Sequence, residues 1–147
     1  MSSLAKDNYH ENISWTLQKG SWTIHLIITL IIKLSFGIFV KESLSWQLTV
    51  IVYNLLTFYL FHWRVGDPFS SEFYNCTFWE QINEQEIDTP HIRFLALYPA
   101  ILFIAVNRIY DWNTHLFIFY LITLIMVTIP KLSFMHLRRI FGYRSHN

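Results

Sequence analysis

The sequence has few charged residues, few glycines and one cysteine. Only 14% of its 147 residues are Asp, Glu, Lys or Arg, whereas 53% are hydrophobic and 18% are aromatic. A water-soluble domain of this size needs more charged surface than that. The single cysteine, Cys76, excludes an intramolecular disulfide, and the four glycines lie too far apart for a phosphate-binding loop. These shortages favour one membrane domain covering residues 1–147.

Charge is missing altogether from two long stretches. Residues 43–63 and 112–130 are runs of 21 and 19 uncharged residues. A helix needs about 20 apolar residues to cross a hydrocarbon layer about 30 Å thick. Each run is therefore long enough to span a membrane.

Two further segments can also span, although each contains or borders charge. Residues 22–40 include Lys33, which costs roughly 2.5–3.5 kcal/mol at a helix centre, but also twelve Ile, Leu, Phe and Val residues, each favourable by about 0.3–0.6 kcal/mol. In residues 92–110, Arg93 and Arg108 lie near the ends, where long cationic side chains can reach the interface. We predict an all-α membrane protein with four transmembrane helices at 22–40, 46–63, 92–110 and 112–130.

Tryptophan and basic residues orient these four segments. Four of the six tryptophans fall at the predicted edges, where indole rings prefer the headgroup region: Trp22, Trp46, Trp63 and Trp112. Eight Lys and Arg residues lie on the side that contains the tail 1–21, the linker 64–91 and the tail 131–147, counting Arg93 at the adjoining start of the third span. The opposite side has two. The positive-inside rule then predicts that both termini are cytosolic.

Short connections predict two antiparallel helical hairpins. The linker between them contains Thr77 and Glu80 at the spacing of a capping box, which indicates a short amphipathic helix. Thr89-Pro90 marks the end of this linker. The short helix is either a solvated linker helix or a docking surface.

The sequence gives no sign of catalysis. The seven histidines form no paired metal-binding motif, and no Asp or Glu lies inside a predicted span. We therefore expect no catalytic residue, no metal and no cofactor. The basic, aromatic C-terminal tail favours anionic lipid headgroups over nucleic acid, because it follows a membrane span.

Lys33 is the one charged residue predicted near the middle of the membrane. Counting ten residues back and ten forward from a turn centred near Ser43 pairs Lys33 with Tyr53, beside Asn54. An intramembrane cation needs a partner, so the Tyr53 hydroxyl and the Asn54 carbonyl are candidate acceptors. The alternative is that Lys33 extends along the protein surface to the interface.

Several short motifs together resemble one family. In chain order they are Phe61-His62, Gly66-Asp67-Pro68-Phe69, Trp79-Glu80-Gln81, Pro99, Ile129-Pro130-Lys131-Leu132 and Arg139-Ile140-Phe141-Gly142. Their order and spacing are similar to those of the ORM/ORMDL family. The resemblance implies a multi-pass endoplasmic reticulum membrane protein that restrains serine palmitoyltransferase in response to ceramide. It also implies that the pyridoxal phosphate cofactor belongs to the partner enzyme.

The resemblance also suggests one ligand-binding residue. Asn12 stands eight residues before Gly20, a spacing similar to that of the family asparagine that contacts the ceramide head group. A carboxamide both donates and accepts hydrogen bonds, as an amide-diol head group requires. The alternative is an ordinary asparagine of the tail.

Two functional readings follow from the sequence. The first is a non-catalytic subunit that negatively regulates serine palmitoyltransferase and thereby sphingolipid homeostasis. The alternative is an endoplasmic reticulum membrane adaptor or assembly chaperone that does not sense lipid.

Overall fold

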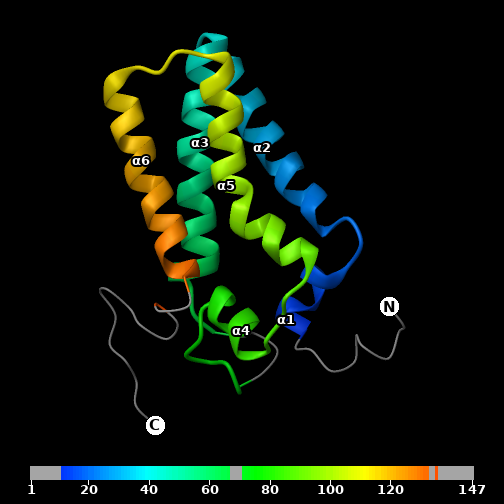
Figure 1. Ribbon diagram of the computed structural model, residues 1–147. Coiled ribbons are helices and arrows are strands. Elements are labelled where there is room, and N and C mark those ends of the chain that lie inside the picture. The colour runs from blue at the N-terminus through cyan, green and yellow to red at the C-terminus, as the bar shows by residue number, and fades with distance from the viewer. Residues whose placement is uncertain (1–10, 67–70, 133–134, 136–147) are drawn as a thin grey trace.

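The structure is a computed structural model that describes residues 11–66, 71–132 and 135 (Figure 1). The predictions for the first ten residues, for Asp67-Pro68-Phe69 and for most of the C-terminal tail lie outside the described residues. Four long helices lie side by side, and two short helices, α1 and α4, lie at one end of them (Figure 1).

The described residues are helical and contain no strand beyond one isolated bridge between Val65 and Thr77. The elements are α1 (Glu11–Ser14), the 3-10 turn η2 (Trp15–Leu17), α2 (Ser21–Gly37), α3 (Glu42–Phe58), the π-helical turn η3 (Tyr59–Trp63), α4 (Phe78–Glu84), α5 (Pro90–Ile109), α6 (Thr114–Thr128) and the 3-10 turn η4 (Ile129–Lys131). The all-α prediction is therefore confirmed.

Three of these helical segments are long and apolar enough to cross a membrane. They are Glu42–Trp63, Pro90–Ile109 and Thr114–Lys131, with 22, 20 and 18 residues. The helix α2 is apolar but has 17 residues, at the lower limit for a span. The structure thus supports a multi-pass protein, and the fourth span remains a prediction.

The central helix is α3, which packs against α2, α5 and α6. Polar side chains connect the helices inside the bundle, as is common where no water is present. The Tyr53 hydroxyl lies 2.8 Å from His25 Nδ1, and Asn54 Nδ2 donates to Thr123 Oγ1 at 3.3 Å. Because α6 packs more on α3 than on α5, the division into two hairpins also remains a prediction.

The start of α4 follows the predicted capping box. Thr77 Oγ1 accepts from the Glu80 backbone N–H at 3.3 Å, and Glu80 Oε2 accepts from the Thr77 N–H at 2.6 Å. Thr89 caps α5 in a similar way, with Pro90 in its first turn, where a missing N–H costs nothing. The start of α4 was predicted from sequence and is confirmed, whereas α5 begins at Pro90, two residues before the predicted span.

The environment of α4 is different from a solvated linker helix. Four consecutive residues of this helix are buried: Trp79, Glu80, Gln81 and Ile82. Trp79 and Ile82 pack against the N-terminal segment and the start of α5, in a cluster that also includes Ile13, Ile92 and Leu95. The solvated reading of the linker helix is therefore wrong, because α4 closes one end of the bundle.

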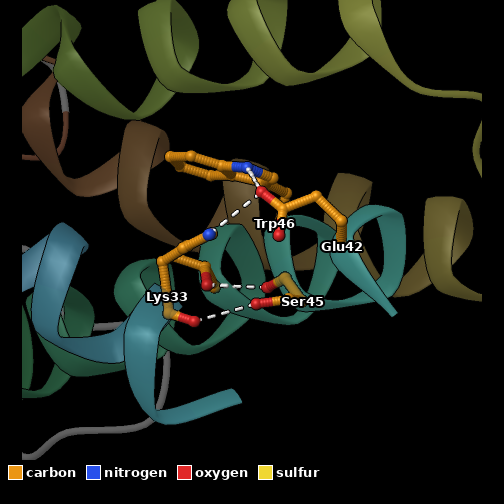
Figure 2. A network of polar contacts seen from close by, with 5 residues as sticks. Lys33, Glu42, Ser45 and Trp46 are labelled. Atoms are coloured by element: carbon orange, nitrogen blue, oxygen red, sulfur yellow. Dashed lines mark hydrogen bonds and ion pairs between the residues drawn. The ribbon is translucent and has the colours of Figure 1, made fainter. Parts of the chain in front are cut away.

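The predicted partners of Lys33 are also wrong. Its Nζ lies 2.9 Å from Glu42 Oε1 and 5.7 Å from the centroid of the Trp46 ring, and Trp46 Nε1 donates to the same Glu42 oxygen (Figure 2). Ser45 Oγ donates to the Lys33 backbone carbonyl at 2.9 Å. Lys33 therefore belongs to the end of the bundle opposite α4.

The error lies in where the turn was centred. The connection between α2 and α3 runs from residue 38 to residue 41, so its midpoint lies between residues 39 and 40. Counting from that midpoint places Lys33 opposite Trp46, whereas a turn near Ser43 placed it opposite Tyr53. A shift of a few residues in the turn thus moved Lys33 by two helical turns along α3.

Candidate functional site

A recess with polar and apolar walls lies at the end of the bundle that carries α1 and α4. It has a volume of about 430 Å³. We call it the head pocket. Its walls come from the N-terminal segment, the end of α3, the linker and α4, and are formed by Asn12, Trp15, Leu60, Phe61, Arg64, Val65, Gly66, Tyr74 and Phe78.

Asn12 enters this pocket from α1 and is held by α4. Its Nδ2 donates to Gln81 Oε1 at 2.7 Å, across 69 residues of sequence. This bond uses one N–H of the carboxamide, which retains a second N–H and a carbonyl oxygen that can accept. Asn12 is half-buried, so a ligand in the pocket can reach its side chain.

Gln81 joins three segments that are distant in sequence. Its side chain has no exposed surface. While its oxygen accepts from Asn12, its Nε2 donates to the backbone carbonyls of Gly66 and Cys76, each at 3.3 Å. All the hydrogen-bonding atoms of this buried amide are therefore used to hold the pocket walls together.

Gly66 turns the chain where α3 passes into the linker. Its φ is +102°, a conformation that residues with a Cβ rarely adopt. The same residue donates from its N–H to the Cys76 carbonyl at 3.0 Å. The glycine thus allows the two linker carbonyls to face the Gln81 amide.

The N-terminal segment is fixed against the bundle from α1 onward. Ile13 and Thr16 are fully buried, and Thr16 Oγ1 donates to the Ile13 carbonyl at 2.7 Å. The Trp15 ring packs against those of Phe78 and His25. Residues 11–21, predicted as part of a cytosolic tail that contains the candidate ligand contact Asn12, therefore form one wall of the site.

A second, apolar recess adjoins the head pocket. It has a volume of about 250 Å³, lies between α2 and α3, and shares Trp15, Leu60 and Phe61 with the head pocket. We call it the apolar groove. Its remaining walls are Ile24, His25, Ile28, Tyr53, Leu56 and Thr57.

The two recesses suit a ligand that is polar at one end and apolar at the other. Asn12 and Arg64 supply hydrogen-bond donors in the head pocket, and the apolar groove offers aliphatic and aromatic side chains. Among the described residues no cluster of His, Cys, Asp or Glu is arranged to hold a metal ion. The arrangement is that of a binding site for an amphipathic molecule.

The structure separates the residues singled out from sequence. Asn12 lies in the head pocket, and Tyr53 lines the apolar groove. Asn54 is fully buried against α6, and Lys33 lies at the far end of the bundle, beside the start of α3. Sequence reasoning missed Gln81 as the residue that holds Asn12, although the Trp79-Glu80-Gln81 motif contained it.

Comparisons with known proteins agree with the motifs. The family model described as "ORMDL family" matches residues 10–139. An uncharacterised protein of Schizosaccharomyces pombe is 36% identical over 140 residues, which cover 92% of this chain and 74% of that protein.

Two named relatives extend the comparison. Protein ORM2 of Saccharomyces cerevisiae is 33% identical over 88% of this chain, and the match spans 62% of that longer protein. The ORM1-like protein of Drosophila melanogaster is 31% identical over 92% of each chain. The family match over residues 10–139 includes all the helices and both recesses, and we conclude that the chain belongs to the ORMDL family.

Proposed function

We propose that this protein is a non-catalytic subunit that lowers the activity of serine palmitoyltransferase when ceramide is abundant, in the endoplasmic reticulum membrane. Membership of the ORMDL family supports this function. The single structural observation that carries the proposal is that Asn12, the candidate ceramide contact, lies in a polar pocket that adjoins an apolar groove.

The chemistry of ceramide fits this pair of recesses. Its head has an amide and two hydroxyls, which need both donors and acceptors, and its two chains are apolar. The Asn12 carboxamide offers both kinds of group. The apolar groove lies between α2 and α3, and we expect a lipid chain to enter it from the bilayer.

The proposal includes four spans and cytosolic termini. In α2, 17 residues extend about 25 Å at 1.5 Å per residue, and the exposed apolar residues Ile38 and Phe39 follow it directly. The N-terminal segment and α4 lie at one end of the bundle (Figure 1), so both face the cytosol if the basic residues do. Accessibility of single introduced cysteines to a membrane-impermeant reagent, in sealed microsomes, tests this topology.

Reconstitution of the synthase complex in vesicles tests the function. Added ceramide should lower synthase activity in complexes that contain this chain and should have less effect in complexes without it. Asn12→Ala should raise the half-maximal ceramide concentration about tenfold, the effect of losing one hydrogen bond of about 1.4 kcal/mol.

Asn83→Ala is the matched control. Asn83 lies on α4 but does not line either recess, so this variant should retain the ceramide response. An unchanged response in Asn12→Ala would remove Asn12 from the site. A complex that assembles and shows no ceramide response at all would favour the adaptor or assembly chaperone instead.

A further inference from the structure

The proline inside α5 leaves an acceptor without its helical donor. Pro99 is buried in the middle of this helix and has no N–H. The backbone carbonyl four residues earlier, at Leu95, therefore lacks the hydrogen bond that an α-helix normally supplies. The helix changes direction along its length (Figure 1), as expected near an internal proline.

Lys131 supplies the missing donor from a different helix. Its Nζ donates to the Leu95 carbonyl at 3.1 Å and to the Ala96 carbonyl at 3.4 Å. These bonds span 36 and 35 residues of sequence and join η4, at the end of α6, to the bend in α5. A charged donor forms a stronger bond to a carbonyl than a neutral one does.

The same ammonium group also contacts α4. Its Nζ lies 5.3 Å from the centroid of the Trp79 ring, within the range of a cation–π interaction. Trp79 is 5% exposed, so the contact is shielded from water. Lys131 thus joins α5, α6 and α4 at one point.

The helix that Lys131 contacts also carries the residue that holds Asn12. Gln81 stands two positions after Trp79 in α4, and it binds Asn12 and the linker carbonyls. A shift of α4 that moved Trp79 would move Gln81 with it. The position of Asn12 in the head pocket therefore depends on contacts made by Lys131.

We infer that Lys131 is a positioning residue for the head pocket: docked on the Leu95 carbonyl that Pro99 exposes and on the neighbouring Ala96 carbonyl, it holds α4, and through Gln81 it holds Asn12. The inference rests on the proposed function for its ligand, ceramide. Its structural part, that Lys131 fixes α4 only because Pro99 frees a carbonyl, is independent of ceramide and of the synthase.

Cys76 provides a native probe of α4. It is the only cysteine in the sequence, it is half-buried, and it directly precedes the capping residue Thr77. The experiment measures the rate at which a maleimide labels Cys76 in the full chain, in phosphatidylcholine nanodiscs without ceramide. Lys131→Met removes the donors while keeping a side chain of similar length against Trp79.

Lys131→Met should raise the labelling rate about tenfold, because losing a hydrogen bond from a charged donor favours local opening by at least that factor. Lys131→Arg should label at the unmodified rate, since a guanidinium also donates to two carbonyls and stacks on an indole. An unchanged labelling rate in Lys131→Met would overturn the inference.

A double-mutant cycle with Pro99→Ala separates positioning from general stability. Alanine at position 99 restores the N–H to the Leu95 carbonyl, so Lys131→Met should raise the rate much less in that background. Equal effects in both backgrounds would overturn the inference. If Lys131→Met alone does not fold, Pro99→Ala is compared with the double variant that carries both substitutions. A folded double variant supports the inference, and a double variant that does not fold overturns it.

Ceramide inhibition of the reconstituted synthase measures whether Lys131 affects ligand response. Lys131→Met should raise the half-maximal ceramide concentration several-fold, and Lys131→Arg should restore it. If the unmodified complex responds to ceramide and Lys131→Met responds equally, the positioning role is excluded. If the unmodified complex does not respond, the proposed function fails, and the labelling experiment still decides the role of Lys131.

Discussion

The two ends of the bundle each contain a lysine beside a tryptophan, and the two lysines have different surroundings. At the end opposite α4, Lys33 lies 5.7 Å from the Trp46 ring and pairs with Glu42, whose side chain is 54% exposed. At the other end, Lys131 lies 5.3 Å from the Trp79 ring and binds backbone carbonyls.

The two sets of contacts differ in how far apart in the sequence the joined residues lie. The Lys33 contacts join α2 to the first turn of the next helix, nine to thirteen residues away, and stabilise one tight connection. The Lys131 contacts join segments 35 to 52 residues apart and support the wall of the head pocket. We expect ligand binding to depend on the second network and to be indifferent to the first.

A matched pair of buried glutamines gives the largest expected effect. Gln81→Leu should destabilise the chain by about 2–4 kcal/mol, because it removes the side-chain donor to the Gly66 carbonyl, one of two donors to the Cys76 carbonyl, and the acceptor for Asn12. It should also abolish most of the ceramide response. Thermal unfolding in nanodiscs and ceramide inhibition of the reconstituted synthase measure the two effects.

Gln47→Leu is the control at the opposite end. Gln47 is 3% exposed, and its Nε2 donates to the Asp111 carbonyl at 2.8 Å and to Ser43 Oγ at 3.1 Å. Its loss should also lower the unfolding temperature but leave the half-maximal ceramide concentration unchanged. An equal loss of ceramide response in both variants would break the comparison between the two ends.

Lys33→Met should have a smaller effect. Methionine retains contact with Trp46 and removes an ion pair whose acidic partner is largely exposed, and such pairs add little stability. Assembly with the synthase and the ceramide response should be those of the unmodified chain. Co-purification and the inhibition assay check this, and a lost response would give Lys33 the functional role that its contacts do not suggest.

The sequence was sufficient for features that depend on local chemistry. Thr77 and Glu80 predicted the start of α4 because capping involves residues three positions apart, and Thr89-Pro90 marked the end of the linker. The long helices follow from runs of apolar residues. Their observed ends differ from the predicted ones by up to five residues, since α3 begins at Glu42, before the predicted span, and changes to η3 after Phe58, within the apolar run.

Long-range contacts could not be predicted in this way. The partner of Lys33 depends on the centre of a turn, and a small error there moved it from Trp46 to Tyr53. The contact of Asn12 with Gln81 joins segments 69 residues apart, and no local pattern specifies it. The acceptor for Lys131 exists only because Pro99 lies one turn beyond Leu95, which the sequence contains but does not connect to residue 131.

Asp88 tests whether the ceramide response depends on where a contact lies in the bundle or on whether that contact is buried. It lies in the connection between α4 and α5, at the same end of the bundle as the contact of Lys131 with α4, but its side chain is 65% exposed. The hydrogen bond from the Arg93 guanidinium holds the pKa of the Asp88 carboxyl below its usual range. A carboxyl with a lowered pKa contributes stability above its ordinary pKa of about 4 and loses it as the pH falls further.

Asp88→Asn should therefore remove only a small stabilisation, seen at neutral pH and vanishing in acid, because solvent screens this exposed pair. The ceramide response should not change. Thermal unfolding at neutral pH and below pH 4, together with the inhibition assay, measures both. A shifted ceramide response would mean that any contact at this end of the bundle controls the pocket. An unshifted one, beside a shifted response in Lys131→Met, would assign that control to the buried contacts of Lys131.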